Sequence, residues 1–377
     1  MRERALIAMS GGVDSSVAAF LVREMGYDCI GAMMKLYTNE DLGLERTRTC
    51  CSLDDASDAR AVAFRLGMPF YVFNFADEFR EKVIGEFISE YERGRTPNPC
   101  ITCNRCLKFE RFLRRARELE CEKMATGHYA RIERMGNRFL LKKALDASKD
   151  QSYVLYSMTQ EQLARTLLPL GALTKREARE IAAAQGFVNA EKPDSQDICF
   201  VPDGDYAGFL ERTRGKAYPP GDFLNARGEK IGEHRGAIRY TIGQRKGLGL
   251  ALGFPAYVCA KDMRKNTVTV SDERALFSKE ATVENVNWIA CDAPAAPIRA
   301  QIRVRYRQPE QPARIHPISE TRVRIEFDAP QRAVTPGQAA VFYDGDTVLG
   351  GGVIGGLSHR PAACRRILRA TPFSAAE

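Results

Sequence analysis

Long apolar runs are absent from this sequence. No uninterrupted apolar stretch approaches the ~20 residues that a membrane span requires, although 44% of the 377 residues are hydrophobic. The apolar run within MRERALIAMSGG is too short for the core of a secretory leader. Charged residues make up 28% of the chain, which is unlike a collagen, a mucin-like stalk or a fully disordered protein. We therefore expect a globular, cytoplasmic protein that has no membrane partner.

The excess of positive charge is small. The chain has 56 Lys and Arg against 48 Asp and Glu, which gives a net charge of +8. This balance permits a polyanionic partner without requiring one. No internal repeat is apparent, and at roughly 100–200 residues per domain the length predicts two or three domains.

Cysteine is the informative residue type. The eleven cysteines are an odd number, and a reducing cytosol disfavours a structural disulfide framework. Cys29, Cys259 and Cys291 stand in apolar strings and are typical of buried packing residues. Five other cysteines lie close together in sequence: the pair Cys50-Cys51, and Cys100, Cys103 and Cys106 in TPNPCITCNRC. Such a cluster indicates a metal site, an iron–sulfur group or a catalytic thiol, although for the Cys50-Cys51 pair we favour packing.

The first part of the chain alternates strand and helix signals. Short apolar runs at 5–10, 28–35, 70–75 and 121–130 suit buried parallel strands. Segment 16–27 has helical spacing, and segment 52–67 is a helix that Ser52 can cap and Gly67 can end. This order predicts a doubly wound α/β sheet with its ligand crevice at the carboxyl ends of the strands. We assign this domain to residues 1–205.

The texture becomes β-rich after this domain. We expect a small β-rich central domain over 206–280, a C-terminal β-barrel over 281–365 and a loose tail over 366–377. In AQIRVRYRQ, residues 300–308, apolar side chains alternate with Arg303, Arg305 and Arg307, which predicts one strand with a basic face. The string AAVFYDGDTVLGGG predicts a hairpin over Asp344-Gly345.

The strongest motif is SGGVDS at 10–15, which follows a strand and opens a helix. Its two glycines let backbone N–H groups approach a phosphate, its serines add hydroxyl donors, and a helix N-terminus favours negative charge. The alternative is an ordinary glycine turn with capping serines. Asp14 could likewise cap the helix or hold Mg²⁺. No Gly-Lys-Ser/Thr follows, so the loop is not a Walker A motif; it resembles the pyrophosphate loop of the ATP pyrophosphatases.

Further strings occur along the chain in a fixed order. They are the double cysteine before DDASDA, GRTPNPC-x-x-CN-x-x-x-KF, ATGHYAR, KDQSYVLY, PDSQDICF, YTIGQRKGLG and PGQAAVFY. Together with SGGVDSSVAA they resemble the tRNA-uridine 2-sulfurtransferases, from about residue 4 to about residue 356. The resemblance implies an enzyme that adenylates the C2 oxygen of the wobble uridine of tRNA. A cysteine persulfide then replaces that oxygen with sulfur.

The resemblance also implies roles for single residues. Cys103 matches the nucleophile and Cys199 the persulfide carrier, and the two would form a transient disulfide during turnover. ATP contacts are implied at Ala8, Met9, Ser10, Gly11, Gly12, Val13, Asp14, Ser15, Met34 and Gly127. Contacts to the target base are implied at Asn98, Pro99 and Cys100. Contacts to tRNA are implied at His128, Lys149, Asp150, Gln151, Arg305, Tyr306 and Gln338. The sulfur would come from a donor protein, a desulfurase or a relay protein, or from free sulfide.

Cys100 departs from the family pattern, because many members have an aspartate there. With Cys103 and Cys199 it could supply three thiolates to a [4Fe–4S] cluster. Structural zinc is a further alternative, although a second C-x-x-C or a histidine pair is absent. Persulfide chemistry without a cluster is the interpretation we favour.

Simpler interpretations exist for two tRNA positions. His128 could be a satisfied strand-end histidine, and the Lys149–Gln151 turn could merely be solvated. If Arg305 binds phosphate, Arg305→Ala weakens tRNA binding and lowers its salt dependence. Rival functions are an ATP pyrophosphatase that uses ammonia and a non-catalytic RNA-binding or iron–sulfur protein. An ATP pyrophosphatase that uses ammonia would leave Cys103 and Cys199 without a role. The intact SGGVDS loop argues against a non-catalytic protein.

Overall fold

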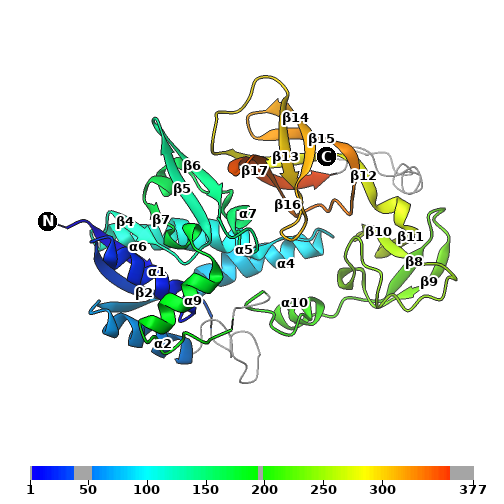
Figure 1. The fold of residues 1–377 in the computed structure, drawn as a ribbon. Coiled ribbons are helices and arrows are strands. Elements are labelled where there is room, and N and C mark those ends of the chain that lie inside the picture. Colours follow the sequence, from blue (N-terminus) through cyan, green and yellow to red (C-terminus); the bar gives the residue numbers. More distant parts are fainter. Residues whose placement is uncertain (1, 38–52, 194–197, 357–377) are drawn as a thin grey trace, which may run out of the picture.

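The computed structural model describes residues 2–37, 53–193 and 198–356. Three sheets organise these residues along the chain (Figure 1). Ser52, the Cys50-Cys51 pair and the predicted tail at 366–377 lie outside the described residues.

The N-terminal sheet is parallel and has five strands in the order β3-β2-β1-β4-β7. Its strands are β1 (Arg4–Ala8), β2 (Asp28–Lys35), β3 (Phe70–Asn74), β4 (Lys123–Ala125) and β7 (Thr166–Leu167). The predicted strand at 28–35 matches β2 residue for residue. The fold prediction of a doubly wound α/β domain is confirmed.

Helices cover both faces of this sheet. The helical segments of the domain are α1 (Val13–Glu24), α2 (Leu53–Arg65), α3 (Ala76–Glu78), the π-helix η2 (Phe79–Ile84), α4 (Gly85–Glu92), α5 (Pro99–Cys103), the π-helix η3 (Asn104–Phe112), α6 (Leu113–Glu118), α7 (Ser152–Leu155), α8 (Gln160–Ala164), the 3₁₀ helix η4 (Pro169–Ala172) and α9 (Lys175–Ala184). Helix α10 (Tyr206–Arg214) follows after residue 205. Helices α1, α2 and α9 pack on the face that carries Ala5 and Ile7. Leu6 points the other way, into a core shared with α4 and α6.

The central domain is built on a four-stranded sheet in the order β10-β11-β8-β9. It contains β8 (Gly221–Leu224), β9 (Lys230–His234), the 3₁₀ helix η5 (Ala237–Arg239), β10 (Tyr257–Asp262), β11 (Thr267–Ser271) and the 3₁₀ helix η6 (Glu273–Leu276). Phe223, Val258 and Val268 fill its separate small core.

The C-terminal sheet closes on itself, because β12 pairs with both β15 and β17. Its strands are β12 (Phe277–Trp288), β13 (Ile298–Arg303), β14 (Gln311–Ser319), β15 (Arg322–Arg332), β16 (Ala339–Asp344) and β17 (Thr347–Gly356). The hairpin between β16 and β17 turns at Gly345-Asp346, at the end of the predicted position. One prediction here is wrong: β13 ends at Arg303, so Arg305 and Arg307 belong to a turn and not to a strand face.

A hairpin of the N-terminal region joins the barrel sheet. It consists of β5 (Ala130–Met135) and β6 (Arg138–Lys143), and Lys142 of β6 pairs with Thr347 of β17. The main hydrophobic core continues across the same junction, from Leu141 and Tyr153 to Val341 and Tyr343. The barrel is therefore packed directly on the domain that carries the SGGVDS loop at 10–15, the candidate nucleotide loop (Figure 1).

Candidate active site

The SGGVDS loop follows the carboxyl end of β1 and leads into α1, as the sequence predicts. Gly11 has a φ of +77°, and a Cβ atom there would lie 2.3 Å from the backbone oxygen of Asp55. Only glycine tolerates both the positive φ and this close approach of the backbone. Gly12 is the N-cap residue of α1 and has no side chain to cap the helix, so the first N–H groups of the helix suit an anion.

Serine hydroxyls fix the shape of this loop. The Ser15 hydroxyl donates to the Gly12 carbonyl oxygen over 3.0 Å and accepts from the Ser10 N–H over 3.1 Å. The Ser10 hydroxyl lies 3.3 Å from the same Ser15 oxygen. Ser10 is exposed and Ser15 is buried, so Ser10 is the hydroxyl that a phosphate can reach.

The other predicted ATP positions surround the loop. A Cβ atom on Gly127 would lie 2.8 Å from the backbone of Asp14 and Ser15, so Gly127 lets the chain after β4 touch the first turn of α1. Met9 and Val13 point into the core, which leaves only their backbone for a ligand. Ala8 and Met34 are half-buried at the carboxyl ends of β1 and β2. The structure thus gathers all the predicted ATP positions at one edge of the sheet.

Two lysines that the sequence reasoning missed flank the loop. Lys192 Nζ donates to Asp55 over 2.6 Å, to Asp58 over 2.7 Å and to the Gly11 carbonyl oxygen over 3.2 Å. Burial lowers the pKa of Lys192, but Asp55 and Asp58 outweigh it and raise the pKa. The three contacts together tie the loop to α2. Lys175, the first residue of α9, lies on the other side with Nζ 2.7 Å from Asp14 Oδ1.

The environment of Asp14 decides what it could bind. Tyr129 OH donates to the same oxygen, Oδ1, over 2.8 Å, and the carboxylate is about one-third exposed. Asp14 does not cap α1, because Gly12 is the N-cap residue. It is the one carboxylate in residues 8–16, and carboxylate oxygen is the ligand type that magnesium prefers.

The predicted nucleophile lies on a separate helix. Asn98 caps α5 by accepting the N–H of Cys100 over 3.1 Å, and Pro99 occupies the first turn, where a missing N–H costs nothing. Cys100 is exposed, while Cys103 is half-buried against the main core at the point where the helix widens into the π-helix η3. Such π-helical turns are common at functional sites.

Burial determines the protonation of Cys103. It raises the pKa of the thiol to about 11, and the neighbouring thiols of Cys100 and Cys106 act in the same direction. The Lys108 ammonium opposes this rise. Near neutral pH, Cys103 is therefore a thiol that must lose its proton before it can attack.

His128 lies near the same ammonium and is buried. Its Nδ1 is 2.7 Å from the Thr126 hydroxyl, and its ring packs on Phe109. Burial, assisted by Lys108, holds the pKa of His128 well below its ordinary value. The His128 side chain is therefore neutral near pH 7 and lies in the segment that follows β4.

Cys199 packs against the same core as Cys103, and its carbonyl oxygen accepts a hydrogen bond from Tyr37 OH over 2.8 Å. Both side chains are half-buried against this core. Among the residues that the structure describes, no group of three His, Cys, Asp or Glu side chains is placed to hold a metal ion. Cys100, Cys103 and Cys199 are all among these residues, so the structure does not bring the three thiols together as one ligand group.

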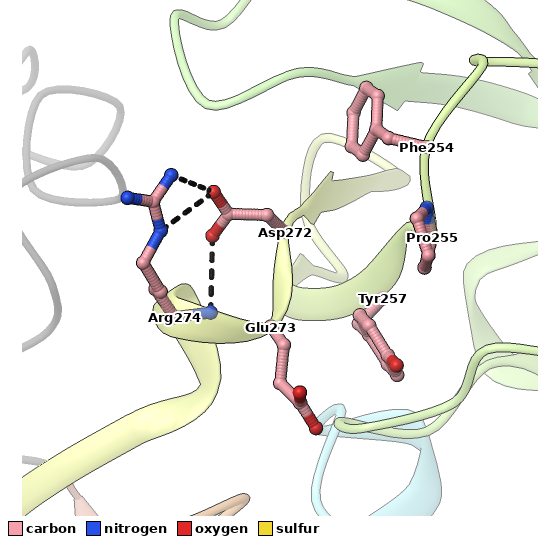
Figure 2. A pocket seen from close by; sticks show the side chains of 6 residues that line it. All are labelled: Phe254, Pro255, Tyr257, Asp272, Glu273 and Arg274. Atoms are coloured by element: carbon pink, nitrogen blue, oxygen red, sulfur yellow. Dashed lines mark hydrogen bonds and ion pairs between the residues drawn. The ribbon is translucent and has the colours of Figure 1, made fainter.

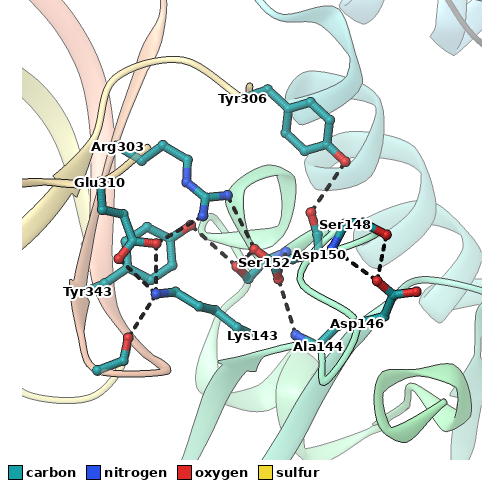
Figure 3. Close-up of polar contacts among 11 residues, drawn as sticks. Lys143, Ala144, Asp146, Ser148, Asp150, Ser152, Arg303, Tyr306, Glu310 and Tyr343 are labelled. Carbon is teal, nitrogen blue, oxygen red and sulfur yellow. Dashed lines mark hydrogen bonds and ion pairs between the residues drawn. The ribbon is translucent and has the colours of Figure 1, made fainter. Parts of the chain in front are cut away.

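The Lys149–Gln151 segment is tied into the barrel (Figure 3). Asp150 is almost fully buried and accepts from the N–H groups of Ala144 and Ser152 and from Arg303 Nη1, the last over 3.3 Å. Gln151 Oε1 accepts the N–H of Tyr129 over 2.9 Å. These two side chains are engaged inside the protein, and Lys149 is half-buried at the start of the turn.

The barrel presents Tyr306 on the loop that follows Arg303. Tyr306 OH donates to the Asp150 carbonyl oxygen over 3.3 Å, and 39% of the residue is exposed (Figure 3). Burial raises the pKa of Tyr306, and Asp150 and, more weakly, the Cys100 thiol of α5 act in the same direction.

Arg305 and Gln338 hold domains together. Arg305 Nη2 donates to the Ile242 and Ala333 carbonyl oxygens and to the Thr335 hydroxyl, the last over 2.7 Å. Gln338 Nε2 donates to the Thr96 carbonyl oxygen over 2.7 Å, just before the cysteine helix. The guanidinium of Arg305 is thus engaged by the central domain and the barrel, whereas the sequence suggested an open basic face.

The central domain has two surface hollows. Figure 2 shows one of about 350 Å³, lined by Phe254, Pro255, Tyr257, Asp272, Glu273 and Arg274. Its charged groups are paired, Asp272 with Arg274 over 2.6 Å and Glu273 with Arg332 over 2.9 Å. A neighbouring hollow of about 590 Å³ is lined by residues between Arg245 and Ala256. Neither contains a cysteine or a residue of the nucleotide loop.

The parallel sheet with a glycine–serine loop at its carboxyl edge defines a nucleotide-binding α/β protein. Three family models match the chain in succession: the tRNA methyl transferase HUP domain over 3–203, the tRNA methyl transferase PRC-barrel domain over 207–272 and the aminomethyltransferase β-barrel domain over 278–354.

Curated relatives match along nearly the whole chain. The tRNA-specific 2-thiouridylase MnmA of Symbiobacterium thermophilum is 52% identical over 93% of this chain and 92% of its own length. Proteins of the same name from Geotalea uraniireducens and Clostridioides difficile are 50% and 48% identical over 94% of this chain and over 95% and 98% of their own. The chain belongs to the tRNA-specific 2-thiouridylase family.

Solved structures are more distant. A 4-thiouridine synthetase bound to RNA and ATP has a TM-score of 0.34 and 19% identity, and the match covers 56% of this chain and 50% of that one. In the described part of the chain, none of the helices has the length and apolar character needed to cross a membrane.

Proposed function

We propose that the protein catalyses the ATP-dependent 2-thiolation of the wobble uridine of tRNA. The observation that carries this proposal is the 52% identity to a tRNA-specific 2-thiouridylase along nearly the whole chain. The SGGVDS loop supplies the ATP chemistry and the cysteine helix supplies the thiol. No described feature favours an ammonia-using synthetase or a non-catalytic RNA-binding protein.

The first half-reaction is adenylation at the loop. The C2 oxygen of the uridine attacks the α-phosphorus of ATP, and the bond to the bridging oxygen breaks, so that pyrophosphate leaves with the electron pair. The α1 N–H groups and Ser10 bind phosphate oxygens, while Gly11 and Gly127 keep the loop closed around them. Asp14 would hold Mg²⁺, which supplies charge neutralisation for the phosphates when it is bound.

The second half-reaction delivers sulfur. The terminal sulfur of a Cys199 persulfide attacks C2, and AMP leaves with the former C2 oxygen. The Cys103 thiolate then attacks the Cys199 sulfur, which releases 2-thiouridine and leaves a Cys103–Cys199 disulfide. A cellular dithiol reduces this bond. Because burial holds Cys103 as a thiol, its deprotonation must accompany substrate binding, and the Lys108 ammonium favours the thiolate that results.

The tRNA would lie across the cysteine helix and the neighbouring barrel loop. Cys100 and Tyr306 are exposed there and can touch the unstacked base. His128, Asp150, Gln151, Arg305 and Gln338 are engaged in internal hydrogen bonds. Their contribution to tRNA binding is to hold the surface in shape, with contacts to RNA through the backbone.

Several finer assignments belong to this proposal. A persulfide-bearing protein loads Cys199, whereas free sulfide would attack the activated C2 directly without the cysteines. The enzyme works in the cytoplasm, where thiols stay reduced. The catalytic, central and barrel domains span 1–205, 206–280 and 281–365. The proposal takes the sulfur to travel on cysteine thiols as a persulfide, without a cluster.

The test is nucleoside mass spectrometry on unmodified tRNA. The protein, prepared anaerobically, is incubated with tRNA, Mg²⁺ and either a persulfide-bearing donor protein or free sulfide, with or without ATP. We expect 2-thiouridine only with ATP. With the persulfide donor it is lost in Cys103→Ala and in Cys199→Ala, whereas free sulfide attacks the activated C2 directly and sustains thiolation in both variants. The proposal would be overturned if the wild-type protein binds tRNA and its iron content has been measured, but no 2-thiouridine is formed.

A further inference from the structure

Helix α5 carries two of the cysteines one turn apart. Cys100 is its second residue and Cys103 its last, and the N–H of Asn104 donates to the Cys100 carbonyl oxygen, so the turn between the two cysteines is helical. Residues three apart on a helix have their Cβ atoms about 5–6 Å apart, and a disulfide requires Cβ atoms about 3.5–4.5 Å apart. A small movement at the start of α5 therefore suffices to join the two thiols.

Cys100 lies in the first turn of α5, where the N–H groups have no intrahelical partner to lose. Its own N–H donates to Asn98 Oδ1 over 3.1 Å, and the preceding Pro99 has no N–H. The bond to Asn98 spans only two residues, so it can move together with Cys100. Cys100 can thus approach Cys103 without breaking a backbone N–H bond to the rest of the helix.

The thiols of the proposed reaction differ in their exposure. Cys100 is exposed, whereas Cys103 and Cys199 are half-buried against the main core. Core side chains therefore shield the Cys103–Cys199 disulfide that the proposed reaction leaves behind. Reduction requires an attacking thiolate to reach one of the two sulfur atoms, and this shielding hinders the approach of a protein dithiol. An exposed thiol beside Cys103 can instead carry the disulfide to the surface.

Cys106 is also three residues from Cys103, but its surroundings differ from those of Cys100. It is half-buried and lies in the π-helix η3, whose wider turns do not align residues three apart. The Arg105 guanidinium donates to its sulfur and also pairs with Glu86 over 3.3 Å. Cys106 is therefore the matched control for Cys100.

We propose that Cys100 is a resolving cysteine, which returns Cys199 to its thiol form after each turnover. The proposal rests on the function proposed above. The Cys100 thiol loses its proton to water, and its thiolate attacks the Cys103 sulfur of the Cys103–Cys199 disulfide. The Cys100–Cys103 bond forms while the bond to Cys199 breaks, and the electron pair leaves on the Cys199 sulfur, which takes up a proton. No oxidant is consumed, because one disulfide replaces another.

Reduction then takes place at the surface of the protein. One thiolate of a protein dithiol attacks the exposed Cys100 sulfur, and Cys103 leaves as the thiolate. The second thiol of the reductant attacks the mixed disulfide, which frees Cys100 and leaves the reductant oxidised. Cys199 is by then a thiol and can accept the next persulfide.

The first test maps disulfides without tRNA. Wild type, Cys100→Ser and Cys106→Ser are oxidised with diamide, blocked with N-ethylmaleimide and digested with trypsin, which leaves Cys100 and Cys103 together in the peptide 96–105. We expect a Cys100–Cys103 disulfide in wild type and Cys106→Ser, and a Cys103–Cys199 disulfide in Cys100→Ser. A thioredoxin-type protein should reduce the first disulfide and leave the second oxidised, whereas dithiothreitol reduces both. Any other partner of Cys103 in wild type, or equal reduction of both disulfides by the protein, would overturn the proposal.

The second test follows successive turnovers. After one round with ATP, tRNA and a persulfide-bearing donor protein, the enzyme is separated, treated with the thioredoxin-type protein or with dithiothreitol, desalted and recharged. For Cys100→Ser we expect the yield of the second round, relative to the first, to be lost after the protein reductant and restored after dithiothreitol. Wild type and Cys106→Ser should give a full second round after either reductant.

Two outcomes of the second test would overturn the proposal. If Cys100 only contacts the base, Cys100→Ser lowers both rounds equally with either reductant. If Cys100 is a metal ligand, thiolation follows the bound iron, which Cys100→Ser then loses. Failure of the proposed function is distinguishable from both: if wild type forms no 2-thiouridine while the diamide result holds, the proposed function falls and the exchange between the cysteines stands.

Discussion

Replacing Gly11 by alanine is the sharpest probe of the nucleotide loop. A side chain at a φ of +77° costs about 1–2 kcal/mol in the left-handed region. The new Cβ would also lie 2.3 Å from the Asp55 backbone oxygen, and forcing such an overlap costs about 1–3 kcal/mol more. The sum is about 2–5 kcal/mol, taken up by movement of the loop away from α2.

Gly67→Ala is the matched control for this substitution. Gly67 has a φ of +67°, but nothing lies within 4 Å of the position that a Cβ atom would take there, so only the backbone strain applies. Thermal unfolding should shift by about 2–4 °C per kcal/mol, and so further for Gly11→Ala than for Gly67→Ala. ATP affinity should fall at least tenfold in Gly11→Ala and stay unchanged in Gly67→Ala. Equal effects of the two substitutions on unfolding and on ATP affinity would refute this reasoning.

Three further predictions follow from the described contacts. Arg303→Met leaves Asp150 buried without its cation and should lower the free energy of unfolding by about 3–5 kcal/mol in chemical unfolding. The control Arg299→Met removes an exposed ion pair and should change that free energy by less than about 1 kcal/mol. Equal losses in the two variants would contradict this prediction. The folded protein holds the proton of Cys103 more tightly than the unfolded chain does, because burial raises the pKa of this thiol to about 11 from an ordinary value of about 9. The contribution of the protonated thiol to folding stability is therefore fully present below pH 9 and is lost as the pH rises through about 11. Alkylation of Cys103 by iodoacetamide, followed by peptide mass spectrometry, should accelerate up to about pH 11, and a plateau near pH 8 would exclude this environment. Lys192→Met removes the clamp on the loop and should weaken ATP and AMP binding alike, while a loss confined to ATP would show that this lysine contacts the pyrophosphate.

Most of the fold could be predicted from local sequence patterns. Strand β2 and the Asp344 hairpin could be predicted because burial on both faces and a tight turn leave direct marks in a few adjacent residues. The loop could be placed because a glycine with positive φ and its serines are neighbours in sequence. The end of β13 at Arg303 was missed, because alternation of side chains does not reveal where a strand loses its partner.

Contacts between distant segments account for the rest. Nothing near Lys175 or Lys192 in the sequence indicates that each ammonium lies at a loop more than 160 residues away. Arg305 reads as one of a basic row, yet it becomes an interdomain tie because three oxygens converge on it from two domains. Asp150 looks like part of a solvated turn and is buried by the barrel. Such effects depend on domain packing, which no local pattern encodes.

The central claim is that ATP activates the C2 oxygen of the uridine. It can be tested with tRNA in which that oxygen is ¹⁸O, by mass spectrometry of the nucleotide product. The account predicts that each 2-thiouridine formed is matched by one AMP that carries the label, because the C2 oxygen becomes a phosphate oxygen before sulfur displaces it. Label that appears in water or inorganic phosphate, or thiolation accompanied by ADP in place of AMP, would contradict it.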